Sequence, residues 1–358
     1  MHLANFPSVQ IDNSLLNTIR DIAQHVEIES NFCIAHPDYK SLELPKELLE
    51  RVKKLPDQIQ RKHLSLQLRS FLYGIYYNGS MKATLADKSS EQNILPLDIE
   101  NNTVFGMDLK FYNRLHDANS GTGHFDPSWL ILKQENDNSL IVNKGGLRLH
   151  IERDSHLKPT EQSAAVDDLV AIRLPKNFVQ NGFYMAVGNA GQSRSKNVVR
   201  IYFNLTSEGA VAIMSDLTQQ FNDSDLPFSF KALYNPNEYE RYDSGVLYFG
   251  KEDYQKVKSI LQNIYQHNRT FFEPEIPLFT KHLAPGMGLA EEPNINFSQP
   301  ESFGMNRCQI VANGLLSAYR QGNNSLEARM NAIYQQFSLL DIDLNHPYLN
   351  ARSENIYF

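Results

Sequence analysis

Alternating apolar and polar residues predict a β-strand in the middle of the chain. Residues 198–205 read VVRIYFNL, and strand geometry puts the odd-numbered side chains on one face and the even-numbered ones on the other. The odd-numbered face is wholly apolar, whereas the other face carries Arg200, Tyr202 and Asn204. The pattern therefore predicts a strand with one face for the core and one polar face.

A strand–helix–strand unit is predicted around this segment. A second alternation, FSFKAL at 228–233, predicts a strand whose polar face carries Lys231. Between the two strands, residues 208–221 have apolar side chains at helical spacing. A unit of this length normally forms a right-handed crossover between parallel strands, with the helix on the apolar face. The bare face of a central mixed sheet would then bring Lys231 beside Arg200 and Tyr202.

A third strand is predicted at GVLYFG, residues 245–250, which puts Tyr248 on the polar face if the strand joins the same sheet. Arg241 and Asp243 lie in the segment that leads into it. A face rich in cations and tyrosines suits phosphate chemistry, because arginine binds phosphate with two parallel N–H groups. The ordinary alternative is a sheet face that meets water, and alternation alone leaves both readings open.

Helical patterns dominate both ends of the chain. Apolar residues at helical spacing fill its first part, so residues 1–85 are expected to form an N-terminal helical region. The polar stretch 86–103 is expected to be a linker or mobile loop. Residues 104–350 are expected to form an α+β domain that ends in helices near 304–321 and 325–340. We therefore predict an α+β fold with a central mixed sheet and helical layers at both ends.

Composition narrows the classes of function. The 358 residues are 41% apolar, as in folded proteins, and the net charge of −7 without a dense basic cluster argues against nucleic-acid binding. No apolar run approaches the roughly 20 residues that span a bilayer. The first residues lack the layout of a secretory signal, and only Cys33 and Cys308 are present. A cytoplasmic protein without a disulfide scaffold is expected.

The segment 111–129, FYNRLHDANSGTGHFDPSW, is a second candidate site. His116, His124 and Asp126 could ligate a divalent metal, which would suit a metal-dependent hydrolase. Their spacing, however, matches neither a zinc-binding His-x-x-x-His helix nor an EF-hand loop. We favour a loop that closes over a site, with Trp129 as its packing anchor.

Two further cations follow in Pro/Gly-rich sequence. Lys281 lies in LFTKHLAPGMGLAEEP, and Arg307 lies in SFGMNRC, near the start of a predicted helix capped by Ser302. A helix N-terminus favours anions through its free amides. The ordinary alternative is a connection with two solvated basic residues.

The order of these segments resembles the HopA-type family, named for a plant-pathogen type III secretion effector. The resemblance covers roughly residues 104–320 and rests on the 111–129 segment followed by KGGLRLHIE, RLPKNFVQNGFYMAVG, VRIYFNLTSEGA, PFSFKALYNPNEYERYDSGVLYF, PLFTKHLAPGMGLAEEP and SFGMNRC. Bacterial relatives are partner proteins in class V lanthipeptide and thioamitide biosynthesis. The family also has a distant likeness to phosphothreonine lyase effectors.

The resemblance implies a phospho-Ser/Thr lyase, an enzyme of the carbon–oxygen lyase class. A kinase-like partner would phosphorylate a precursor peptide, and this protein would eliminate the phosphate to leave a dehydroamino acid. Such a reaction needs a base, cations for the leaving phosphate and stabilisation of a developing enolate, and it requires no metal or cofactor. Neither a nucleic acid nor a membrane is expected as a partner.

The resemblance also implies roles for single residues. Lys231 falls at the position of the base and Tyr202 near that of the acid, where the lyases have a histidine; His150 is an alternative acid. The expected phosphate-binding residues are Arg200, Arg241, Tyr248, Lys281 and Arg307, and Asn204, Lys144 and His150 are expected to complete the pocket. The alternative function is a type III effector-like or non-catalytic protein that binds a peptide or a kinase.

Overall fold

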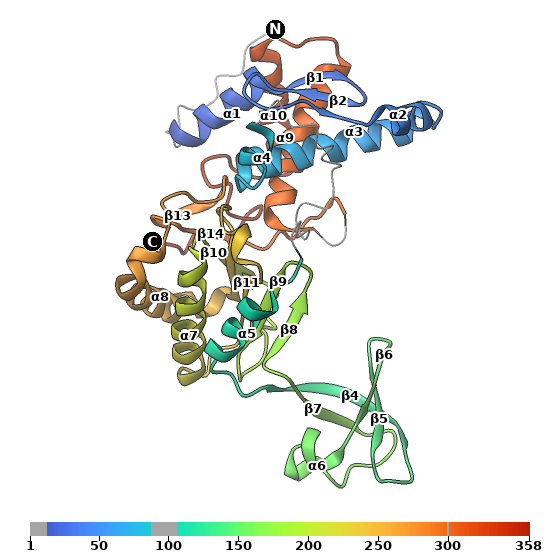
Figure 1. Cartoon of the computed structure of the whole chain (residues 1–358), viewed down its shortest axis with the longest axis vertical. Helices are drawn as coiled ribbons and strands as arrows, with labels where there is room; N and C mark the ends of the chain where they lie inside the picture. Colours follow the sequence, from blue (N-terminus) through green and yellow to red (C-terminus); the bar gives the residue numbers. More distant parts are fainter. Residues whose placement is uncertain (1–12, 87–105, 299–300) are drawn as a thin grey trace.

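The computed structural model describes residues 13–86, 106–298 and 301–358. In these ranges the chain forms an α+β fold with ten α-helices and three antiparallel sheets. Figure 1 shows a helical layer at one end, a large sheet with its own helices in the middle, and a small sheet that projects at the far end. From residue 87 onward, the expected linker lies outside the described residues.

Helices from both ends of the chain build one layer. Helix α10 packs on α9 and on α1, and α3 packs on α9, so they share one hydrophobic core with the central sheet. The helices expected at both ends of the chain are thus present, and they pack together as one layer on one side of the central sheet. Its elements are α1 (Asn13–His25), α2 (Lys46–Val52), α3 (Asp57–Leu72), the π-helical turn η1 (Tyr73–Tyr77), α4 (Lys82–Ala86), α9 (Phe303–Arg320) and α10 (Leu326–Leu339), with a small sheet of β1 (Glu27–Ser30), β2 (Cys33–Ala35) and β3 (Leu42–Glu43).

The central sheet has seven strands, and every neighbouring pair is antiparallel. Their spatial order is β13 (Lys281–Ala284), β14 (Met287–Glu291), β10 (Val198–Phe203), β12 (Gly245–Gly250), β11 (Phe228–Leu233), β9 (Phe183–Val187) and β8 (Asn177–Gln180).

The predicted parallel crossover and mixed sheet are wrong. Strands β10 and β11 are joined through helix α7 (Ser207–Asp223), but β12 lies between them and pairs antiparallel with both. Strands β10 and β11 therefore run in the same direction without touching as neighbours. Apolar alternation specifies which face of a strand is buried, but it does not specify which strand lies next to it.

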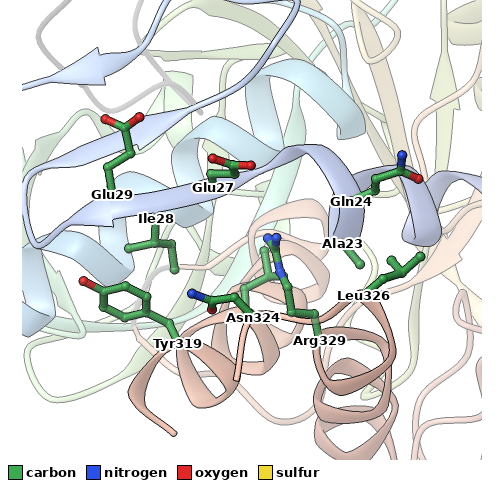
Figure 2. A pocket seen from close by; sticks show the side chains of 10 residues that line it. Ala23, Gln24, Glu27, Ile28, Glu29, Tyr319, Asn324, Leu326 and Arg329 are labelled. Atoms are coloured by element: carbon green, nitrogen blue, oxygen red, sulfur yellow. The ribbon is translucent and has the colours of Figure 1, made fainter. Parts of the chain in front are cut away.

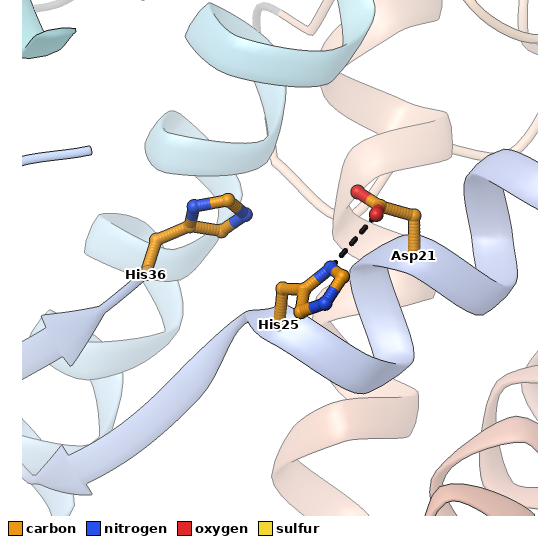
Figure 3. A group of neighbouring side chains, drawn as sticks. All are labelled: Asp21, His25 and His36. Atoms are coloured by element: carbon orange, nitrogen blue, oxygen red, sulfur yellow. Dashed lines mark hydrogen bonds and ion pairs between the residues drawn. The ribbon is translucent and has the colours of Figure 1, made fainter. Parts of the chain in front are cut away.

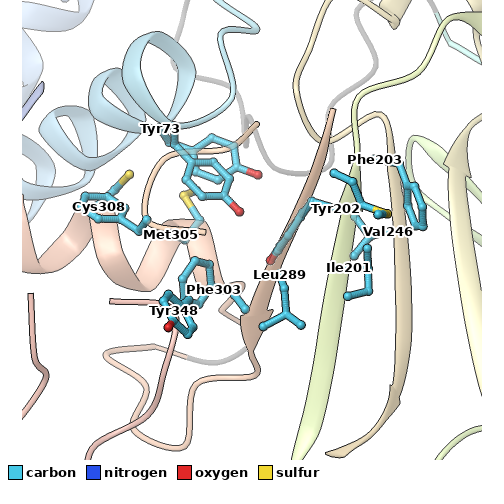
Figure 4. Packing of buried hydrophobic residues seen from close by; sticks show 14 of the residues in the cluster. Tyr73, Ile201, Tyr202, Phe203, Val246, Leu289, Phe303, Met305, Cys308 and Tyr348 are labelled. Carbon is cyan, nitrogen blue, oxygen red and sulfur yellow. The ribbon is translucent and has the colours of Figure 1, made fainter. Parts of the chain in front are cut away.

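Both faces of the central sheet are covered. On the apolar face, Phe221 of α7 packs against Phe228 of β11 with ring centroids 5.0 Å apart, and α8 (Tyr254–Asn268) packs on α7. The polar face turns toward the helical layer, where Figure 4 shows Tyr202 reaching from the sheet toward Tyr73 and Phe303. The alternative of a solvated polar face is therefore wrong.

The small projecting sheet has its own core. Trp129 is buried there among aliphatic side chains that form a cluster separate from the main core. The segment 111–129, predicted to be a loop, instead contains most of helix α5, which packs on α7, a short connection at 119–123 and the start of the long strand β4. The elements of this region are α5 (Leu109–Ala118), β4 (His124–Gln134), β5 (Leu140–Lys144), β6 (Leu147–Ile151), α6 (Arg153–His156) and β7 (Leu169–Leu174).

None of the helices in the described ranges combines the length and the apolar character needed to cross a membrane.

Candidate functional site

The register of the central sheet brings the predicted polar face together. Arg200 on β10 lies opposite Tyr248 on β12. In the next row of the same face, Tyr202 and Lys231 both lie opposite Val246, one from each side. The insertion of β12 thus keeps these side chains on one surface, although it separates β10 from β11.

A small pocket lies over this surface. Its volume of ≈ 10 Å³ is about the room that one water molecule needs. The sheet contributes cationic and tyrosine side chains, the segment before β12 contributes an ion pair, and the helical layer closes the other side. The lining residues are Arg200, Tyr202, Lys231, Val246, Phe183, Arg241, Asp243, Tyr73, Tyr77 and Ser302.

Lys231 forms no hydrogen bond or ion pair with the described residues of this pocket. Its side chain is buried, with a relative exposure of 7%. Its Nζ lies 4.3 Å from the ring centroid of Phe183 and 5.9 Å from that of Tyr248, and it makes no hydrogen bond or ion pair with any described residue. A buried amine without such partners is costly, because water would otherwise solvate it. The amine is therefore available to a ligand.

Arg241 and Asp243 form a buried, two-point ion pair. The guanidinium donates from Nε to Oδ1 at 2.6 Å and from Nη2 to Oδ2 at 2.9 Å. The hydroxyl of Tyr73 and the amide of Asn78 also donate to this carboxylate, at 3.1 and 3.2 Å. Burial alone would raise the pKa of Asp243, but the charges of Arg241 and Lys231 and the bonds from Arg241 and Tyr73 outweigh it and hold the pKa below its ordinary value.

Arg200 also has a carboxylate partner. Its guanidinium donates to both oxygens of Glu292, with 2.7 Å between Nη2 and Oε1, and it stacks 5.1 Å from the ring centroid of Tyr248. Glu292 is one-third exposed, whereas Asp243 is buried. The two guanidinium groups at the pocket thus face two carboxylates, and the amine of Lys231 lies beside them without a carboxylate of its own among the described residues.

Two buried tyrosine hydroxyls, those of Tyr77 and Tyr202, lie beside each other in the pocket. Neither forms a well-aligned hydrogen bond with a described residue, so both can turn to a ligand. The two rings meet edge-on with centroids 6.3 Å apart. Burial raises the pKa of both phenols, so both stay protonated. The pocket thus offers two neutral O–H donors to a ligand.

The N-terminus of α9 borders the same pocket. Ser302 caps this helix by accepting a hydrogen bond from the Met305 amide at 3.4 Å, and it also lines the pocket. The close approach depends on Gly304, because a Cβ there would lie 2.3 Å from the ring of Tyr77. The positive end of an 18-residue helix therefore adds to the cationic character of the site.

Three of the expected pocket residues are held elsewhere in the domain. Arg307 is fully buried in α9 and donates to the carbonyls of Pro347 and Leu349, at 2.8 and 2.9 Å; burial lowers its pKa to about 10. Lys281 begins β13 and packs over the ring of Tyr348. Asn204 follows β10, and its side-chain amide donates to the carbonyl of Glu275 at 3.1 Å. None of the three lines the pocket.

Lys144 and His150 lie in the small projecting sheet of β4 to β7, so the expectation that they share a pocket with Lys231 is not met. Lys144 is on β5 and pairs with Asp126 at 2.5 Å. His150 is on β6 and lies 2.6 Å from the hydroxyl of Ser139. The alternation that marks a polar strand face does not reveal which of two sheets the strand joins.

The candidate metal residues of 111–129 do not converge. His116 lies 3.3 Å from the hydroxyl of Tyr184, and Asp126 is bound by Lys144 and by the indole N–H of Trp129. No set of ligand atoms from His116, His124 and Asp126 comes together in the described chain. This arrangement gives the metal-dependent hydrolase no support.

Asp21, His25 and His36 do converge, with one ligand atom of each within 4.8 Å of the others (Figure 3). The contacts around them form a chain of hydrogen bonds. Tyr76 donates to Asp21 at 2.9 Å and lies 2.9 Å from Nε2 of His36, while Nδ1 of His36 accepts the Asp38 amide at 3.1 Å. Both ring nitrogens of His36 are thus occupied, so this cluster is better explained as a structural hydrogen-bond network than as a metal site.

A larger cavity of ≈ 340 Å³ lies between β1 and helices α9 and α10 (Figure 2). Glu27, Glu29 and Arg329 line it, but no histidine, cysteine or lysine does. Arg329 donates to the carbonyl of Val26 and so serves the fold. The small pocket around Lys231 is therefore the better candidate for chemistry.

Sequence reasoning missed the contribution of the N-terminal helices to the pocket. Tyr73 and Tyr77 stand in the segment SFLYGIYY, where aromatic residues at helical spacing are more typical of a core. The pattern contained no signal that their hydroxyls reach a polar site.

A family comparison identifies the part of the chain that holds the central sheet. Residues 174–349 match the model of the HopA1 effector protein family. The chain carries a HopA1 effector family domain. This domain includes all seven strands of the central sheet and every pocket residue except Tyr73 and Tyr77. The small sheet and the N-terminal helices precede the matched residues.

Two solved structures of effector proteins match the chain over most of its length. The effector protein from Pseudomonas syringae pv. tomato strain DC3000 is 15% identical, with a TM-score of 0.43 over 85% of this chain and 95% of that chain. The effector protein from Pseudomonas syringae pv. syringae strain 61 is 14% identical, with a TM-score of 0.42 over 80% of this chain and 98% of that chain. No curated protein matches the sequence.

Proposed function

We propose that this protein is a phospho-Ser/Thr lyase that acts on a phosphorylated peptide. The observation that carries the proposal is the amine of Lys231, which is buried beside Arg200 and Arg241 without a hydrogen bond or an ion pair to any described residue. A general base takes up a proton most readily when it need not first break a hydrogen bond or an ion pair to a neighbouring group. The amine of Lys231 meets that requirement. The two guanidinium groups supply the charge that a phosphate ligand needs.

The reaction uses groups that face one pocket. The Nζ of Lys231, starting as the unprotonated amine, takes the proton from Cα of the phosphorylated residue, and the electron pair left behind forms the Cα=Cβ double bond. The Cβ–O bond breaks, and its electrons leave with the phosphate. The hydroxyl of Tyr202, which burial keeps protonated, donates its proton to the departing oxygen. The products are a dehydroamino acid and inorganic phosphate.

Phosphate binding must rearrange the pocket. The present volume of ≈ 10 Å³ is too small for a phosphate group, and both arginines hold carboxylates. Glu292 is more exposed than Asp243, so water can solvate its carboxylate once Arg200 releases it. Arg200 therefore exchanges its carboxylate for phosphate at a lower cost than Arg241 does. The N-terminus of α9 lies beside the same space and favours an anion there.

The substrate in this proposal is a precursor peptide that a kinase-like partner phosphorylates on Ser or Thr. The pocket is small and buried, so it can recognise the phosphorylated side chain but little of the peptide around it. A partner that modifies the peptide must therefore also help to determine which peptide is processed.

A non-catalytic protein that binds a peptide or a kinase, comparable to a delivered effector, is the second candidate. The observation that favours it is the carboxylate partner of each pocket arginine. With Arg200 and Arg241 paired, the pocket holds its shape without a ligand.

Mass spectrometry of a phosphopeptide distinguishes these functions. The purified protein is incubated with phosphoserine and phosphothreonine peptides, with and without the kinase-like partner. A lyase removes the elements of phosphoric acid and leaves an alkene, whereas a phosphatase leaves the hydroxyl. If the peptides bind but keep their mass under every condition, the binding protein is the correct reading and the lyase is excluded.

A further inference from the structure

Tyr77 reaches the pocket from the helical layer, outside the HopA1 domain. It is the last residue of the π-helical turn η1, which continues directly from α3. Its buried ring stacks on Tyr73 with centroids 4.9 Å apart, meets Tyr202 edge-on at 6.3 Å and lies 6.5 Å from Phe303. The side chain is therefore fixed between the helical layer and the central sheet.

The π-turn explains how both tyrosines reach the same space. The amide of Asn78 donates to the carbonyl of Tyr73 at 3.0 Å, an i→i+5 bond that widens the helix by one residue. In this wider turn, Tyr73 and Tyr77 stack with only 23° between their ring planes. Single π-turns in helices are rare in proteins overall, but those that occur are often found at functional sites.

The tyrosines of η1 differ in what their hydroxyls do. Tyr73 donates to Asp243 at 3.1 Å, and Tyr76, which lies outside the pocket, donates to Asp21 at 2.9 Å. Tyr77 lines the pocket, and its buried hydroxyl lies beside that of Tyr202 without forming a well-aligned hydrogen bond to any described residue. A buried hydroxyl without a partner costs about 1–3 kcal/mol, which phenylalanine at this position would avoid.

We propose that Tyr77 is a catalytic residue of this pocket, whose hydroxyl donates a hydrogen bond to the leaving phosphate. Negative charge develops on the phosphate oxygens as the Cβ–O bond breaks, and a fixed, neutral donor stabilises that charge without reorganisation. Tyr202 supplies the proton, and Tyr77 binds the group that accepts it. The inference rests on the proposed lyase function, and it makes the N-terminal helical layer part of the active site.

Steady-state kinetics of Tyr77→Phe test the inference, with Tyr76→Phe as the matched control in the same turn. Loss of one such donor typically lowers kcat by about 10²–10³-fold. We expect Tyr77→Phe to lower kcat by about that factor with little change in KM, and Tyr76→Phe to keep the wild-type kcat. Because the lost hydroxyl makes no well-aligned hydrogen bond to a described residue, Tyr77→Phe should unfold at the same or a higher urea concentration than the wild type.

Two results would overturn the role of Tyr77. One is a wild-type kcat in Tyr77→Phe; the other is a loss of activity that follows a loss of stability, as a purely structural residue would give. Calorimetric binding of inorganic phosphate separates this inference from the lyase proposal. If the wild type eliminates no phosphate, the lyase proposal fails. In that case, the proposed contact between Tyr77 and phosphate is supported only if Tyr77→Phe binds inorganic phosphate several-fold more weakly than Tyr76→Phe does.

Discussion

Asp243 holds the polar side of the pocket together. Its carboxylate accepts hydrogen bonds from Arg241, Tyr73 and Asn78, and both members of the ion pair are buried. Asp243→Asn would leave the Arg241 guanidinium buried without a counter-charge. We expect a loss of about 3–5 kcal/mol in the free energy of unfolding, measured by urea titration.

The pair between Arg352 and Asp341 is the control for this substitution. Its Nε–Oδ2 distance of 2.8 Å is similar, but both side chains are mostly exposed. Asp341 has a φ of 56°, a conformation that asparagine also adopts readily. Asp341→Asn should therefore cost less than about 1 kcal/mol. Equal losses in the two variants would mean that burial does not govern the Arg241–Asp243 pair.

The stability gap between the wild type and Asp243→Asn should depend on pH. The pKa of Asp243 is lower in the folded protein than in the unfolded chain, so the pair contributes its full stability above about pH 4. As the pH falls further, the unfolded chain takes up the proton first, and this contribution is lost. Urea midpoints should show a constant gap from about pH 5 to 7 that narrows below about pH 4.

Strand alternation was sufficient to place Arg200, Tyr202 and Lys231 on one face, because a strand's period of two is independent of its neighbours. It could not show that Arg200 is paired with Glu292, which comes from a segment more than 90 positions away. It also could not reveal Tyr77, whose partners are set by the packing of the helical layer on the sheet.

At the level of elements, hydrophobic periodicity predicted where several strands and helices lie in the sequence, but it did not predict how they are arranged in space. The predicted segments 228–233 and 245–250 coincide with β11 and β12, whose residues are buried except for the half-buried Tyr248. The strands β1, β2, β3 and β8 were missed because runs of two to four residues carry almost no periodic signal. The 11-residue strand β4 was missed as well, because its first residues were predicted to belong to a loop. The order of strands depends on long-range pairing, so it could not be read from local pattern.

The contact between η1 and α9 closes the pocket, and Gly304 permits it. An alanine Cβ at this position would lie 2.3 Å from the ring of Tyr77 and 2.8 Å from that of Tyr73. Gly304→Ala should push the two helical elements apart and lower stability by about 1–3 kcal/mol, as overpacking of a core does. Elimination activity should fall with it, because Tyr77 would leave its position.

Ser317→Ala is the control for this substitution, since Ser317 is a half-buried residue of the same helix, α9. It should change neither the urea midpoint nor the activity appreciably. If Gly304→Ala behaves like this control, the close packing of η1 on α9 is not required for the site.

At the scale of the whole molecule, the described residues form two separate hydrophobic cores. The helical layer and the central sheet share one large cluster, whereas the small projecting sheet buries only its own cluster around Trp129. A small core supports little stability by itself, so the two parts need not unfold together. The small sheet lies outside the matched HopA1 residues and contributes nothing to the pocket.

Trp129 is the single tryptophan of the chain, so its fluorescence reports the small sheet alone. Far-UV circular dichroism reports mainly the helices of the other two layers. We expect the fluorescence transition to occur at a lower urea concentration than the circular dichroism transition. Coincident transitions would show that the two cores unfold as one cooperative unit.

The most direct test of the lyase proposal is the rate of phosphate elimination by Lys231→Met. Methionine keeps an unbranched apolar side chain but lacks the amine, and Lys256→Met on the exposed surface of α8 is the control. We predict that the wild type and Lys256→Met convert a phosphothreonine peptide to the dehydro product. Lys231→Met should be slower by about 10²–10⁴-fold, the usual contribution of a general base, with an unchanged circular dichroism spectrum. A Lys231→Met variant that eliminates phosphate at the wild-type rate would contradict the account.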